Sequence, residues 1–173
     1  TKTMDTIGSG PTLQVTDERL TQEQRTVIEK AFQRRSKQIK LRRKLRQLNM
    51  AKIRDGEGFS IETRNNNLKS KVKVDQKIIE CDQISHYTHP YSKPYSKFLE
   101  IDGVRFFKKT GDPAYYHVLT THPGEDSIWT MNPLEGEWIT QDRVIHWFRR
   151  DRPWLRGVPE TLPTLPLWAL LRR

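Results

Sequence analysis

A long stretch without glycine or proline extends from Thr21 to Asp55, and it limits what this part of the chain can form. Glycine and proline are the residues that most often end a helix, so their absence predicts a basic helix over residues 21–55. Thr21 stands three residues before Gln24, which is the spacing of a capping box and marks a helix start. Gly56 follows directly, as expected at a helix end.

The apolar residues of this helix fall on two stripes, which lie on nearly opposite sides when the residues are plotted at about 100° each. The two stripes consist of Ile28, Phe32 and Ile39, and of Leu41, Leu45 and Leu48. One straight helix on one core would not show this pattern. Either the helix breaks near Ser36, or its two halves pack against different partners.

Between Lys30 and Arg54 there are eleven basic residues and no acidic residue. A solvated helix usually alternates the signs of its charges, because ion pairs one turn apart stabilise it, so a run of one sign indicates an external anion. Contact with nucleic-acid phosphates is the preferred interpretation, and a solvated basic face is the alternative. The residues predicted to contact phosphates are Arg34, Arg35, Lys37, Lys40, Arg42, Arg43, Lys44 and Arg46.

The whole chain is basic as well, with 31 lysines and arginines against 21 acidic residues and a formal charge of +10. Such a balance favours a polyanionic partner. A second basic cluster, which includes Arg149 and Arg150, lies far along the chain from the first. Positive charge at both ends predicts a long footprint on an extended polyanion rather than a small substrate site.

Residues 56–71 contain two glycines and three consecutive asparagines, and they are predicted to be a loop. Short apolar and aromatic runs then recur about every ten residues between turn residues, which is typical of an antiparallel meander or a small SH3-like barrel. We therefore expect a small β domain over residues 72–150. The predicted fold class is α+β, with a basic helix, this β domain and extended arms at both ends.

The pair Asp102-Gly103 predicts a two-residue type I′ turn, and this turn fixes the pairing of a hairpin. Its cross-strand pairs would be Ile101 with Val104, Glu100 with Arg105, Leu99 with Phe106, and Phe98 with Phe107. One face, with Leu99 and Phe106, would join the core. The other face would carry a Glu100–Arg105 ion pair.

That second face combines aromatic and basic residues, namely Arg105, Phe107 and Lys109. Oligonucleotide-binding sheets use this combination to stack bases and pair phosphates. We therefore add these three residues to the predicted nucleic-acid contacts. For Phe107 the equal alternative is cover by the tail or by the long helix.

The remaining segments are predicted to be arms and a spacer. Residues 1–20 have no sustained period and are predicted to form an extended arm. Residues 89–97, HPYSKPYSK, are predicted to be a stiff extended linker. Residues 151–173 combine four prolines with large apolar residues, which predicts an extended segment that docks on a partner surface. The docking residues are Trp154, Leu162, Leu165, Leu167, Trp168 and Leu171.

Few residues suggest chemistry. Cys81, His86 and His89 have a spacing that resembles half of a zinc site, but the chain has no second cysteine to complete it. No phosphate-binding glycine-rich loop or known catalytic motif is present. We therefore predict no catalytic activity, no metal and no cofactor. No stretch is long and apolar enough for a membrane span.

The function that this pattern favours is a structural RNA-binding subunit of a large ribonucleoprotein, similar in role to a ribosomal protein, with RNA favoured over DNA and with other protein subunits as partners. The single cysteine predicts a reducing intracellular compartment. The start at Thr1 fits a cleaved presequence, so a mitochondrial matrix location is included. The alternative is a DNA-binding accessory or structural protein of a recombination machine or a viral particle.

Overall fold

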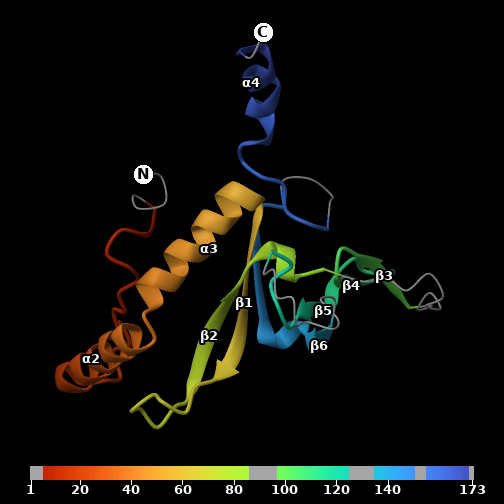
Figure 1. Ribbon diagram of the computed structural model, residues 1–173. Helices are drawn as coiled ribbons and strands as arrows, with labels where there is room; N and C mark the ends of the chain where they lie inside the picture. The colour runs from red at the N-terminus through yellow and green to blue at the C-terminus, as the bar shows by residue number, and fades with distance from the viewer. Residues whose placement is uncertain (1–5, 86–96, 125–134, 151–154, 172–173) are drawn as a thin grey trace.

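The computed structural model describes residues 6–85, 97–124, 135–150 and 155–171. Two helices are followed by two antiparallel sheets and a short C-terminal helix, so the predicted α+β fold class is confirmed (Figure 1). The docking residue Trp154 and the predicted linker at 89–97, except Lys97, lie outside the described residues.

The predicted basic helix consists of two helices, α2 (Gln22–Gln38) and α3 (Leu41–Asp55). The capping box is present: the Gln24 backbone N–H donates to the Thr21 hydroxyl at 3.3 Å, and the Thr21 N–H donates to the Gln24 side chain at 2.9 Å. The expected break occurs at Ile39 and Lys40 rather than near Ser36, which stays helical. Lys40 adopts a left-handed conformation with φ of 55°, and this residue turns the chain into α3.

The left-handed Lys40 leads to a stability prediction. A side chain in this conformation costs roughly 1 kcal/mol, which glycine avoids. Lys40→Gly is therefore expected to leave the free energy of unfolding unchanged or to raise it by up to about 1 kcal/mol. Arg43→Gly, inside α3, should lower it by about 1 kcal/mol. Urea denaturation of both variants checks this, and equal losses would contradict it.

Sheet A consists of β1 (Glu57–Arg64), β2 (Val74–Ile79) and β7 (Val144–Phe148), in the order β2-β1-β7. The prediction of a loop over residues 56–71 is therefore wrong for its first half. β1 is buried on both faces over Glu57 to Ile61, so it lacks the polar alternation of a half-exposed strand. Gly58 is needed there because a Cβ would lie 2.8 Å from the Leu48 carbonyl of α3.

Sheet B consists of β3 (Phe98–Ile101), β4 (Val104–Phe107), β5 (Pro113–Leu119) and β6 (Gly136–Thr140), in that order. The predicted hairpin register is confirmed at all four pairs, and the turn residues Asp102 and Gly103 both have positive φ. Leu99 does not join the core, because it is 44% exposed at the edge strand. The closed SH3-like barrel is not confirmed, since the described strands form two separate sheets.

The hydrophobic core lies between the two sheets. Its fully buried side chains come from β1 (Phe59), β2 (Ile79), β4 (Val104, Phe106) and β5 (Tyr116). The Phe59 ring lies edge-on to the Tyr116 ring, with a centroid distance of 5.9 Å. β6 leads into β7 through a short 3-10 turn, η2 (Gln141–Arg143), and this turn joins the two sheets.

The tail is helical where an extended segment was predicted. Residues 155–160 lie against the core, β1 and the end of α3, then η3 (Leu162–Thr164) leads into α4 (Leu165–Leu171). Pro163 and Pro166 both occupy first-turn positions, where a helix needs no backbone N–H from them. The proline count therefore misled the prediction. α4 points away from the sheets and from α3 (Figure 1).

Candidate nucleic-acid and partner interfaces

Four of the eight cations predicted on the helices are bound within the chain. Arg35 donates to the Ser70 hydroxyl and the Val72 carbonyl, each at 2.6 Å, and to the Val74 carbonyl. Lys44 pairs with Asp75 at 2.5 Å. Arg42 and Arg46 both donate to the Gly8 carbonyl, at 2.9 and 3.0 Å, and so hold the N-terminal arm against α3. These four side chains stabilise the fold.

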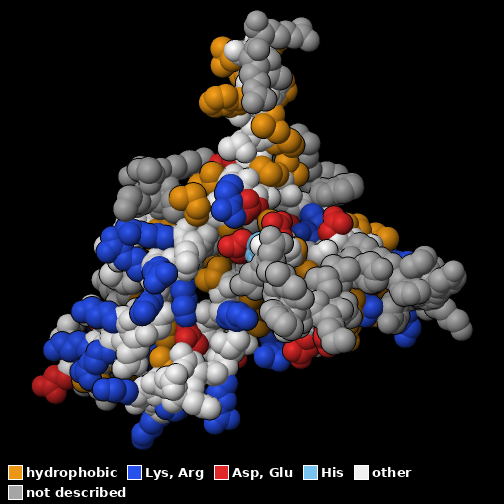
Figure 2. Space-filling model, viewed as in Figure 1, with side chains coloured by type: hydrophobic (Ala, Val, Ile, Leu, Met, Phe, Trp, Pro, Cys, Tyr) orange, Lys and Arg blue, Asp and Glu red, His pale blue; other side chains and the backbone are white. Residues whose placement is uncertain are grey.

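The other four, Arg34, Lys37, Lys40 and Arg43, are exposed, and no hydrogen bond or ion pair of their side chains is found within the described residues. Lys30, Arg34 and Lys37 follow one another at spacings of four and three, so they share one face of α2. We call Lys30, Arg34, Lys37, Lys40 and Arg43 the basic face. Figure 2 shows basic side chains gathered over α2 and α3.

On sheet B, Arg105 is bound as the hairpin register predicted. Its guanidinium pairs with Glu100 at 3.0 Å and stacks 3.5 Å from the centre of the Trp138 ring. It therefore holds the sheet together. Phe107, Lys109 and Arg150 instead meet around a surface hollow of about 640 Å³, which we call the sheet-edge hollow. Arg149, the remaining predicted contact, is exposed.

The predicted docking residues of the tail that the structure describes are all exposed. Leu162, the first of them, is 44% exposed, and Leu171, the last, is 81% exposed. Leu165, Leu167 and Trp168 lie between these values. A helix that is apolar on all sides is normally buried by a partner. The apolar side chains of α4 stand clear of the body in Figure 2.

A buried polar cluster holds the start of this tail, and the sequence-based reasoning missed it. The carboxylate of Glu57, at the start of β1, accepts hydrogen bonds from the Arg156 guanidinium and from the Gly157 backbone N–H at 2.9 Å. It also accepts from His146 Nε2 at 3.0 Å. We call Glu57, His146, Arg156 and Gly157 the Glu57 cluster. A Cβ on Gly157 would overlap the Gly56 carbonyl, so the tail lies directly against the start of β1.

The protonation states follow from the surroundings of Glu57. Burial alone would raise the pKa of this carboxyl, but hydrogen bonds from His146, Arg156 and Gly157 and the Arg156 charge outweigh burial and bring the pKa to about 2. Burial lowers the pKa of His146 despite the opposing effect of Glu57. Neutral His146 therefore donates from Nε2 to Glu57, and its Nδ1 accepts from the Tyr116 hydroxyl at 3.3 Å.

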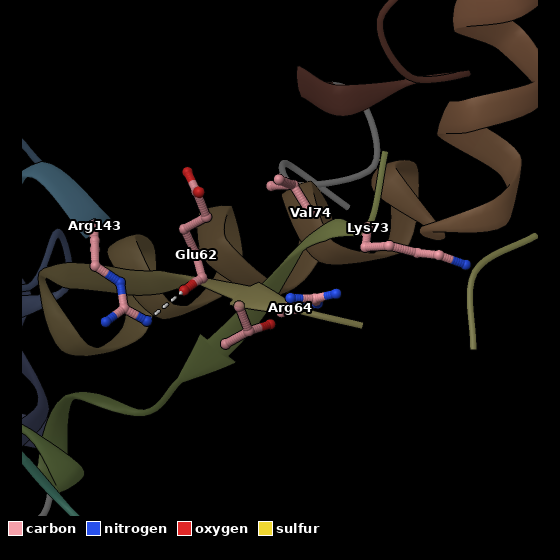
Figure 3. Close-up of a pocket in the computed structure, with 6 residues that line it drawn as sticks. Glu62, Arg64, Lys73, Val74 and Arg143 are labelled. Atoms are coloured by element: carbon pink, nitrogen blue, oxygen red, sulfur yellow. Dashed lines mark hydrogen bonds between the residues drawn. The ribbon is translucent and has the colours of Figure 1, made fainter. Parts of the chain in front are cut away.

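A smaller hollow, of about 270 Å³, lies at the ends of β1 and β2 beside Arg143 (Figure 3). Its cations are bound to nearby groups: Arg143 donates to the Glu62 carbonyl at 3.3 Å and Arg64 to the Asn66 side chain at 3.1 Å. Lys73 donates to backbone carbonyls of the β1–β2 connection. These contacts brace the loop.

Cys81 shows no sign of reactivity. Burial and the neighbouring carboxylate of Asp82 raise the pKa of its thiol to about 12, so it stays protonated. His86 and His89 lie outside the described residues. Among the residues that the structure describes, no three potential ligands gather into a metal site. Over the same ranges, no helix has both the length and the apolar character of a bilayer span.

Comparison with known families decides between the two functional interpretations. The family model described as "Phage portal protein, lambda family" matches residues 2–171. The chain belongs to this family. No curated protein sequence matches it.

Membership of the portal family corrects three predictions. The chain is not a ribosomal-protein-like RNA-binding subunit, because its family consists of structural proteins of viral particles. The mitochondrial matrix is wrong for the same reason, since a phage protein belongs to the particle and its host cell. The preference for RNA over DNA has no support. A portal protein assembles with other protein subunits and with DNA.

The misassignment had a physical origin. Ribosomal and phage structural proteins both use basic helices and apolar arms that other components of an assembly cover. Charge and composition report a polyanion and do not distinguish RNA from DNA. The alternative that named a viral particle is the interpretation that the family supports.

Proposed function

We propose that this chain is a non-catalytic part of a phage portal that contacts DNA through the basic face and neighbouring subunits through the tail. The observation that carries the proposal is the division of the cations: one set is bound within the fold, and the basic face is exposed along the two helices. An exposed row of cations without acids matches a phosphate backbone better than a compact ligand.

The left-handed residue between α2 and α3 adds to this argument. Lys40 belongs to the basic face and also turns the chain between the two helices, so the cations follow a bent path rather than a straight one. The N-terminal arm is held by Arg42 and Arg46 at Gly8 and by Glu29 at Val15, and Arg34 and Lys37 are exposed with the arm bound there. The basic face therefore stays open with the arm in place.

Contact with neighbouring subunits is assigned to the tail because α4 exposes leucines and a tryptophan on several sides. The Glu57 cluster fixes where this helix leaves the body. A second backbone contact, from the Glu160 N–H to the Ile53 carbonyl at 3.2 Å, holds the segment just before η3. The tail therefore exposes an apolar helix, α4, while the segment before it is held against β1 and α3.

Charge reversal tests the DNA contact. The variant Arg34→Glu, Lys37→Glu, Arg43→Glu should bind duplex DNA more weakly, and the slope of log affinity against log salt should fall by about 3, since each lost phosphate contact removes about 0.9. Fluorescence anisotropy of a labelled duplex over a salt series measures both quantities.

The matched control reverses three exposed lysines outside the helices, Lys77→Glu, Lys97→Glu and Lys108→Glu, which changes the net charge equally. This control should keep most of the salt slope. Equal losses in both triple variants would show that only net charge matters, and the basic face would then have no special role.

A further inference from the structure

The sheet-edge hollow is built from parts of the chain that are distant in sequence. Phe107 and Lys109 come from the end of β4 and the turn after it, Gln141 from η2, and Arg150 from the segment after β7. Its volume, about 640 Å³, leaves room for one nucleotide. The strands of sheet B that supply part of its lining, β4 and β5, lie well away from α2 in Figure 1.

The turn that carries Lys109 is held by three hydrogen bonds. The Gly111 N–H donates to the Phe107 carbonyl at 2.8 Å, and the Phe107 N–H donates to the Asp112 carbonyl at 2.9 Å. The Asp112 N–H donates to the Thr110 hydroxyl at 3.3 Å. Lys109 and Thr110 are therefore presented from a defined backbone, which lowers the ordering cost of binding.

The aromatic ring of Phe107 is packed on one side and accessible on another. Its centroid lies 5.1 Å from that of Phe98, and the side chain is still 43% exposed. The Arg150 guanidinium lies 5.4 Å from the centre of the Phe148 ring. The described lining contains two cations, Lys109 and Arg150, and one carboxylate, that of Asp112.

We propose that the sheet-edge hollow binds one unpaired nucleotide of a DNA strand, an inference that takes DNA as the partner from the proposed function. The base stacks on Phe107, Lys109 and Arg150 contact the adjoining phosphates, and Asp112 and Gln141 face the polar edge of the base. A base in an intact duplex is stacked on its neighbours and cannot reach an aromatic ring in a hollow. The basic face has no exposed aromatic ring and suits the duplex backbone instead.

The experiment measures anisotropy of a short labelled oligo(dT) and, separately, of a labelled duplex. Phe107→Leu keeps an apolar side chain but removes the ring, so it should weaken oligo(dT) binding about tenfold, in line with the loss of one stacked base. Lys109→Glu should weaken oligo(dT) binding similarly. Lys108→Glu is the matched control, because Lys108 is an exposed neighbour of the same charge that does not line the hollow.

The outcomes separate this proposal from the basic face. Loss of oligo(dT) binding in Phe107→Leu and Lys109→Glu, with a smaller loss in Lys108→Glu, supports the hollow. Equal loss in Lys108→Glu and Lys109→Glu, unchanged binding in Phe107→Leu, or no binding of oligo(dT) by the parent protein overturns it. If the helix triple variant keeps its duplex affinity while oligo(dT) binding behaves as expected, the basic face fails and the hollow stands.

Discussion

Replacing Glu57 with glutamine is expected to lower the free energy of unfolding by about 3 kcal/mol, because the change leaves the largely buried Arg156 side chain, 11% exposed, without its counter-charge. The Glu57 carboxylate accepts from Arg156, His146 and the Gly157 N–H at once. A neutral amide cannot accept from all three, since one of its two polar atoms is a donor. The loss should therefore exceed that of an ordinary hydrogen bond.

Urea denaturation measures this loss, and Glu62→Gln is its control. Glu62 lies on the same strand, but it is exposed, and its interaction with Arg143 uses the backbone carbonyl. Glu62→Gln should change stability by less than about 0.5 kcal/mol. Tryptic cleavage after Arg156 is a second readout: it should be slow in the parent protein and faster in Glu57→Gln. Similar stability and cleavage in the two variants would contradict the clamping role of Glu57.

The same variant should change the acid response. The Glu57 pKa is about 2 in the folded protein against an ordinary value of 4.5. A carboxyl with a lowered folded pKa stabilises the fold fully above its ordinary pKa and loses that contribution as the pH falls to the folded pKa. The stability difference between the parent protein and Glu57→Gln should therefore shrink as the pH falls from 4.5 to about 2.

Phe59→Ala is the second large effect, with an expected loss of about 3 to 5 kcal/mol. Phe59 is fully buried between the sheets, stacks on His146 at a centroid distance of 4.3 Å and lies beside Tyr116. Truncation removes these contacts and leaves a cavity that the two sheets cannot close. It also removes the ring that lies next to Arg156.

Phe107→Ala is the matched substitution, because it makes the same change at a partly exposed site on sheet B. Its loss should be about 1 kcal/mol or less. Thermal or urea unfolding of both variants checks the difference. Comparable losses would mean that Phe59 is not the central core residue that its burial indicates.

The sequence predicted those parts of the fold whose determinants are local. The Asp102-Gly103 turn set the register of the β3–β4 hairpin, and the capping residues Thr21 and Gln24 set the start of α2. β1 was missed because its partners are distant: it pairs with β7 across Phe59 and His146, and Phe59 packs against sheet B. A strand buried on both faces has no alternation to detect, and its glycines resemble those of a loop.

For the candidate interfaces, as for the fold, the sequence predicted only what residues close together in the chain determine. Composition identified the basic residues of α2 and α3. The direction in which each side chain points decides whether it binds other groups of the chain or stays exposed. Arg34 is exposed, whereas the adjacent Arg35 points to the β2 side and binds three acceptors. The Glu57 cluster joins residues 89 to 100 positions apart, and no spacing rule connects them. The one local indication was an acidic residue between two glycines directly after a basic helix.

The position of Glu57 has a mechanical consequence. β1 is hydrogen-bonded on both sides, to β2 and to β7, and it continues from α3 through Gly56. Tension applied to α4 passes through Arg156 into the Glu57 carboxylate and is then shared by two strand ladders. The same path leads directly into α3. We therefore expect a load on the apolar tail to act on β1 and on α3, which carries the Arg43 end of the basic face.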